Sequence, residues 1–206
     1  MKPRIAIITL KWLTQIAYYG LSIFSILFFI LVTLKVTNII TLPFEKIENM
    51  FAYSLKSSIS EDKKTIYSPN HKIAYTAIRD QYQLKAKPQT AIGLLSIIMR
   101  CAFLFLSVIY IRFFARIFKT ITTNAPFNTR IVSYLKGLAF VSFAFEIAGC
   151  IEYFAGTYLI QNEFPRMHFK LDYQFGDEII TGLIIWVIAF IYEKGASLQQ
   201  ENELTV

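Results

Sequence analysis

The order of hydrophobic and polar positions divides the chain into long apolar blocks with polar stretches between them. In the first block, residues 12–34 form 23 consecutive uncharged positions between Lys11 and Lys35. About 20 apolar residues are enough for a helix to cross the hydrocarbon core of a bilayer. The block is too long for the apolar region of a signal peptide, and no small-residue cleavage site follows it. We therefore expect a retained membrane span.

Three further blocks lie at about 91–111, 137–160 and 179–196. The last is the weakest, because only residues 179–192, 14 in all, are free of charge, which by length alone also fits a re-entrant or interfacial segment. It becomes a full span if the helix continues through Gly195 and the side chain of Lys194 reaches the headgroups. Helices satisfy their own backbone groups inside a bilayer. The pattern predicts an all-α polytopic membrane protein: 1–206 form a single membrane domain with four transmembrane helices.

The connection 35–90 is the one polar stretch long enough to hold structure of its own. Its apolar residues recur at helical spacing in two places, first as Phe44, Ile47, Phe51, Leu55 and Ile59, and later as Tyr75, Ile78 and Tyr82. This spacing predicts an external amphipathic helical segment of two helices between spans 1 and 2. Such helices lie on the bilayer surface or cap the bundle; a sensor for an external ligand is the alternative.

Composition and charge support a membrane location and give an orientation. The chain is 55% hydrophobic and 17% charged, and its net charge of +7 comes from basic residues between the apolar blocks. These residues face anionic lipid headgroups rather than nucleic acid. The loop 112–136 holds five basic and no acidic residues, whereas 161–178 holds two basic and four acidic ones. The positive-inside rule therefore makes the loop 112–136, the tail 197–206 and both termini cytoplasmic, with 35–90 and 161–178 outside.

The sequence contains no signature of an enzyme or of a cofactor site. A phosphate-binding glycine loop, HExxH, GxSxG and paired CxxC motifs are all missing, so we expect no enzyme and no cofactor. His71 and His168 have no second ligand at metal spacing, and Cys101 and Cys150 lie inside apolar blocks as packing residues. We therefore expect no bound metal.

Three charged residues stand inside the apolar blocks. Arg100 shares a helix face with Gly93, Ser96 and Ser107, and Glu146 shares one with Gly149, Cys150, Tyr153, Gly156 and Thr157. Small residues in such stripes let helices approach closely. We predict an intramembrane ion pair between Arg100 and either Glu146 or Glu152, which fixes how spans 2 and 3 dock. A small transporter or channel that uses these residues is the alternative.

Two stretches resemble a known family. Residues 193–206 read EKGASLQQENELTV and are similar to a terminal Gly-x-x-Leu-Gln-x-Glu-x-Glu-Leu-Thr-Val signature, and residues 120–139 read TITTNAPFNTRIVSYLKGLA. Both resemble the YoaS-like bacterial membrane protein family of unknown function, domain-of-unknown-function family twenty-nine seventy-five. The resemblance covers mainly residues 112–206. Asn124 stands where the family commonly has glycine, and asparagine can also cap a helix.

The resemblance implies four spans, a place in the bacterial cytoplasmic (inner) membrane and no known activity. It also implies a partner, because its members are often encoded beside a small helix-turn-helix regulator. We expect a non-enzymatic membrane component of a regulatory pair, with the oligomeric state, including a homo-oligomer, left open. Pro126 and Phe127 form a loop element that starts and anchors the third span. Five tail residues either dock on a partner or on the cytoplasmic loop, or simply fray. They are Glu201, Glu203, Leu204, Thr205 and Val206.

Overall fold

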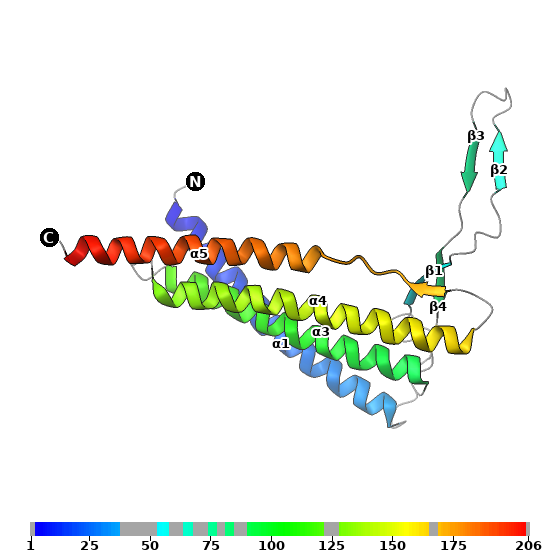
Figure 1. Cartoon of the computed structure of the whole chain (residues 1–206). Coiled ribbons are helices and arrows are strands. Elements are labelled where there is room, and N and C mark those ends of the chain that lie inside the picture. Colours follow the sequence, from blue (N-terminus) through cyan, green and yellow to red (C-terminus); the bar gives the residue numbers. More distant parts are fainter. Residues whose placement is uncertain are drawn as a thin grey trace. The chain divides into compact units, whose positions relative to one another are not determined.

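A computed structural model of the 206-residue chain describes residues 3–37, 53–57, 64–67, 74–77, 81–84, 90–121, 128–164 and 169–204. Four long helices and five short strands lie within these ranges (Figure 1). The helices are α1 (Pro3–Val36), α3 (Ala91–Ile121), α4 (Thr129–Glu163) and α5 (Asp177–Leu204). The strands are β1 (Tyr53–Ser57), β2 (Lys64–Tyr67), β3 (Ala74–Ala77), β4 (Gln81–Leu84) and β5 (Phe169–Leu171).

Each of the four helices is long and apolar enough to cross a membrane. The stretches that qualify are Ile7–Leu34, Ala91–Ile121, Thr129–Glu163 and Asp177–Glu201. They contain all four apolar blocks of the sequence, and each exceeds the ~20 residues that a span requires. The prediction of a helical membrane protein with four such helices is confirmed.

Three of the helices extend into stretches that the sequence assigned to a loop and a tail. α3 continues to Ile121 and α4 begins at Thr129, so most of the predicted loop 112–136 is helical. The α4 start is capped by Asn128, whose side-chain oxygen accepts a 2.9 Å hydrogen bond from the backbone N–H of Arg130. α5 likewise runs through most of the predicted tail. The loop element Pro126 and Phe127 lies outside the described residues.

The prediction of amphipathic helices in the connection 35–90 is wrong wherever the structure describes that connection. Leu55 lies in β1, Tyr75 in β3 and Tyr82 in β4. These strands are short and contain tyrosine, threonine and serine beside the apolar residues, a composition that suits a pleated, half-buried surface. The residues at helical spacing were too few in each segment to distinguish a helix from a strand.

β1 is the central strand of a three-stranded sheet of order β4-β1-β5, in which both neighbours are antiparallel to it. Leu55 of β1 lies opposite Tyr82 of β4 and Leu171 of β5. In β5 the side chains of Phe169 and Leu171 are buried and that of Lys170 is exposed, as the two-residue period of a strand requires. β2 and β3 form a separate two-stranded antiparallel sheet.

The chain divides into two compact units. We call Met1–Leu34, Met99–Ala148 and Gln174–Val206 the helical unit, and Lys35–Ile98 and Gly149–Tyr173 the sheet unit. α3 and α4 contribute residues to both units, so neither unit is a separate piece of the chain. The single membrane domain inferred from the sequence therefore stays a prediction.

Each unit has its own hydrophobic core. In the sheet unit, Leu55 is only 1% exposed and lies in a cluster with Ile92, Ile160, Phe169 and Leu171. The helical unit has a cluster around Ile117, Ile131 and Leu138, surrounded by aromatic side chains. Ile117 and Ile131 belong to the helix ends that the sequence assigned to a loop, and their burial explains why those ends fold as helix.

Candidate functional site

Glu146 of α4 is the one buried charged side chain among the residues that the structure describes, with only 5% of it exposed. Its Oε1 accepts a 3.0 Å hydrogen bond from the backbone N–H of Gly176. Its Oε2 is also buried and has no hydrogen-bond partner within the described ranges. The carboxyl group of Glu146 thus lies against the start of α5, with one of its two oxygens hydrogen-bonded.

Gly176 stands immediately before α5 and caps it. The carbonyl oxygen of Gly176 accepts a 2.9 Å hydrogen bond from the N–H of Ile180, the first such bond of the helix. The φ of Gly176 is +100°, a conformation that glycine adopts without the strain a side chain brings. The carboxylate of Glu146 bonds the N–H of this capping residue, at the end of the helix where the dipole favours negative charge.

Ser142 lies one helical turn before Glu146 on the same face of α4. Its side chain is 0% exposed, and its hydroxyl has no hydrogen-bond partner in the part of the chain that the structure describes. Residues four apart in a helix lie on the same face, so Ser142 and Glu146 are neighbours on α4, and the Oγ of Ser142 and the Oε2 of Glu146 are not bonded to each other in the structure. Buried polar groups without a bond are uncommon in proteins, and two of them one turn apart indicate a site that can take up another group.

Arg100 does not form the predicted pair with Glu146. The side chain of Arg100 is exposed on α3, and none of the ion pairs or hydrogen bonds found among the described residues includes it. The buried positions nearby are Ser96 and Met99, so Arg100 lies beside the inward face of α3 rather than on it. A pair between Arg100 and Glu152 stays a prediction, because Glu152 belongs to the other unit.

The small residues of α4 in the sheet unit make room for the segment before α5 and, at Gly156, for Leu95 of α3. A Cβ on Gly149 would meet the ring of Tyr173, and one on Gly156 would meet the side chain of Leu171. The hydroxyl of Thr157 accepts a 3.4 Å hydrogen bond from the N–H of Leu171. The sequence predicted that another helix approaches this face of α4, and α3 does so at Gly156; the segment before α5 was not predicted, because a stripe of small residues does not specify its partner.

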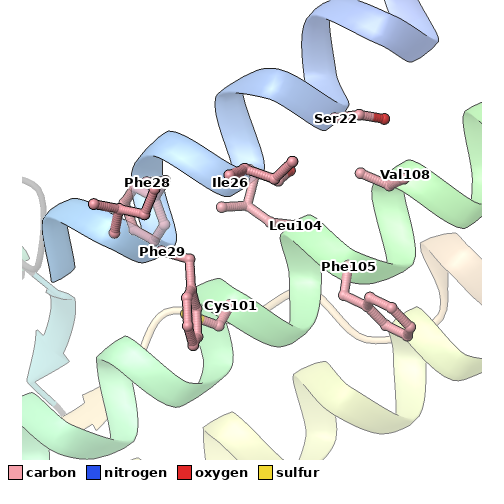
Figure 2. Close-up of a pocket in the computed structure, with 10 residues that line it drawn as sticks. Ser22, Ile26, Phe28, Phe29, Cys101, Leu104, Phe105 and Val108 are labelled. Carbon is pink, nitrogen blue, oxygen red and sulfur yellow. The ribbon is translucent and has the colours of Figure 1, made fainter. Parts of the chain in front are cut away.

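A groove of about 410 Å³ lies in the helical unit between α1 and α3. Figure 2 shows Ile26, Phe28 and Phe29 of α1 and Leu104, Phe105 and Val108 of α3 among the side chains that line it. Its two serines are engaged, since the hydroxyl of Ser22 donates to the carbonyl of Tyr18 at 2.7 Å and that of Ser25 to the carbonyl of Leu21 at 2.8 Å. The groove suits an apolar chain and gives no support to a path for polar solutes.

Charged and polar residues gather where α3 and α5 extend beyond their apolar blocks. We call residues 112–121 of α3 and 193–204 of α5 the polar end. Glu193 accepts a hydrogen bond of 3.0 Å from the ammonium of Lys136 on α4, and the guanidinium of Arg116 lies 5.7 Å from the ring centre of Tyr134. Leu198 is an apolar residue among polar neighbours on α5, and 60% of its surface is exposed.

The predicted tail residues fall partly within the described ranges. Glu201 is exposed on α5, and Glu203 and Leu204 belong to its last turn. Thr205 and Val206 lie outside the described residues, as do His71 and His168. Among the residues described, no three His, Cys, Asp or Glu side chains are grouped closely enough to hold a metal ion. Cys101 and Cys150 are free thiols.

Comparison of the chain with protein-family models, with curated proteins and with solved structures finds no match. The four apolar helices have the length and composition of the spans of a multi-pass membrane protein.

Proposed function

We propose that this chain is a non-enzymatic component of a regulatory pair in the bacterial cytoplasmic membrane, with a soluble regulator bound at its polar end. The proposal includes membership of the YoaS-like family, which rests on the similarity of the tail, and a small helix-turn-helix protein as the partner. Both termini and the polar end are cytoplasmic.

The observation that supports the proposal is the length of α5, which is greater than a membrane span requires. α5 has 28 residues, about 42 Å at 1.5 Å per residue, against a hydrocarbon core of ~30 Å. Counted from Asp177, ~20 residues end near Ala196. Residues 197–204 therefore continue into water, where crossing the membrane does not account for an ordered helix.

The exposed surface of the polar end has the composition of a docking site. It combines Arg112, Arg116 and Lys119 on α3 with Glu193 and Glu201 on α5. Charges of both signs select a complementary partner and steer its approach. The exposed Leu198 supplies an apolar anchor, and burial of a leucine side chain contributes about 1.5–3 kcal/mol.

The orientation is tested with reporter fusions at the N-terminus, within 122–127, within 165–168 and after Val206. We expect cytoplasmic activity at the first, second and fourth places and external activity at the third. A cytoplasmic signal from the third place as well as the second would mean that α4 does not cross the membrane, and it would contradict the four-span topology.

The partner is tested by recovery of the helix-turn-helix regulator with the full-length chain from native membranes, together with the associated transcriptional response. Deletion of residues 201–206 should leave insertion and topology unchanged and abolish both. Leu198→Ala should weaken recovery by about tenfold or more, since loss of that burial is worth over 1.4 kcal/mol. Gln200→Ala, at an exposed polar position two residues away, is the matched control. If the truncated chain keeps the partner and the response, the tail has no docking role.

A further inference from the structure

We infer that Glu146 and Ser142 of α4 form a reversible proton-binding site at the start of α5. The ligand is a proton, which bonds to the free Oε2 of Glu146 and converts the carboxylate to a carboxylic acid; no other bond forms or breaks. This site is independent of the soluble partner proposed above, and its test does not use that partner.

The two unbonded atoms suit both protonation states. A serine hydroxyl both donates and accepts hydrogen bonds, whereas a carboxylate only accepts and a carboxylic acid also donates. After a change of side-chain rotamer that brings the two atoms together, Ser142 can donate to ionised Glu146 and accept from protonated Glu146. A carboxyl group 95% shielded from solvent gains little from water in either state, so the bonds offered by the protein decide whether it holds a proton.

The start of α5 links proton binding to the position of that helix. When Glu146 is ionised, Gly176 donates to a charged oxygen, and such bonds are about twice as strong as neutral ones. The helix dipole adds to this attraction. When Glu146 is protonated, both contributions fall, and the cap that holds the first turn of α5 against α4 is weakened.

The other described charged and titratable groups on the helices around Glu146 do not supply a hydrogen-bond partner for its Oε2. Within the described ranges none of them forms a hydrogen bond or ion pair with its carboxyl group. Two of them are acidic and follow Gly176 directly. These groups are Asp177 and Glu178 of α5, Cys150 of α4, and Arg100, Cys101 and Tyr110 of α3.

The test is infrared difference spectroscopy of the full-length protein in lipid nanodiscs as the pH is lowered. The other Asp and Glu side chains also give carbonyl bands as they are protonated, so we expect the wild type minus Glu146→Gln difference to contain one further carbonyl band, that of Glu146. Glu152→Gln, a matched change on the same helix, and Asp177→Asn should keep the band of Glu146. A band of unchanged amplitude in Glu146→Gln, or its loss in Glu152→Gln, would overturn the inference.

Two further measurements test the inference even if Glu146→Gln does not fold. In Ser142→Ala the carbonyl band should move to higher frequency, because the acid has lost its acceptor; an unshifted band refutes the pairing of the two residues. Hydrogen exchange of a peptide spanning 174–181, corrected for intrinsic pH dependence, should quicken in the wild type when Glu146 is protonated. An equal pH response in Glu146→Gln or Glu146→Leu refutes the link to α5.

Discussion

Replacement of Gly149 by alanine should create a clash between α4 and Tyr173. The atoms nearest to a Cβ on residue 149 are the Oη, Cζ and Cε2 of Tyr173, all closer than real Cβ contacts allow. Overpacking of this kind costs about 1–3 kcal/mol. Alanine in place of glycine within a helix gains up to about 1 kcal/mol, so the net destabilisation is about 0–3 kcal/mol.

The sign of the effect should reverse when the tyrosine ring is removed. In a Tyr173→Ala background, Gly149→Ala meets no ring and should stabilise by up to about 1 kcal/mol. The coupling between the two positions is therefore about 1–3 kcal/mol, in the range measured for residues in contact. Gly20→Ala on α1 is the matched control, since nothing lies within 4 Å of a Cβ there.

The assay is the thermal unfolding midpoint of the four variants in lipid nanodiscs. A change of 1 kcal/mol corresponds to about 2–4 °C for a chain of this size. Equal effects of Gly149→Ala in both backgrounds would refute the contact between Tyr173 and this face of α4.

Two further substitutions test the sheet unit and the start of α5 by the same assay. Leu55→Ala should cost about 2–5 kcal/mol, because a fully buried leucine leaves a cavity in its cluster; an unchanged midpoint would contradict that core. Gly176→Ala should cost about 1–2 kcal/mol through backbone strain alone, since its φ is +100° and the space beside it is open. Gly20→Ala has open space in ordinary helix, and an equal cost at both glycines would contradict the strained conformation.

The four helices were predictable from the sequence because burial in lipid requires only length and a low charge. Those properties are local, and an uncharged run such as 12–34 displays them without any knowledge of the fold. The ends of the helices were less predictable. Ile117 and Ile131 are buried against side chains distant in sequence, and a loop assignment based on charge does not detect such contacts.

The strands and the partner of Glu146 depend on pairings that the sequence does not display. Leu55 fits a helical spacing with Phe51 and Ile59, yet its place is set by Tyr82 and Leu171 on either side of β1. For Glu146 the sequence suggested a cation, whereas the structure supplies a backbone N–H. A backbone donor carries no side-chain signature; the sequence hint was Gly176 directly before two acidic residues, Asp177 and Glu178.

The carboxyl group of Glu146, in the third apolar block, holds the start of the short fourth block, and Glu146→Leu tests this directly. Glu146 is buried on α4, and its Oε1 accepts a 3.0 Å hydrogen bond from the N–H of Gly176, the residue directly before α5. A backbone N–H that is turned toward the protein needs an acceptor there, and this carboxyl group supplies it.

Leucine removes that acceptor and should cost about 1–3 kcal/mol, whereas glutamine keeps a carbonyl oxygen and should cost less. Hydropathy alone predicts the opposite order, because leucine enters a bilayer more favourably than any polar residue. Unfolding midpoints in nanodiscs therefore separate the two accounts. If Glu146→Leu is more stable than Glu146→Gln, the cap contributes less than the polarity of the side chain costs, and the carboxyl group is not there to hold the start of α5.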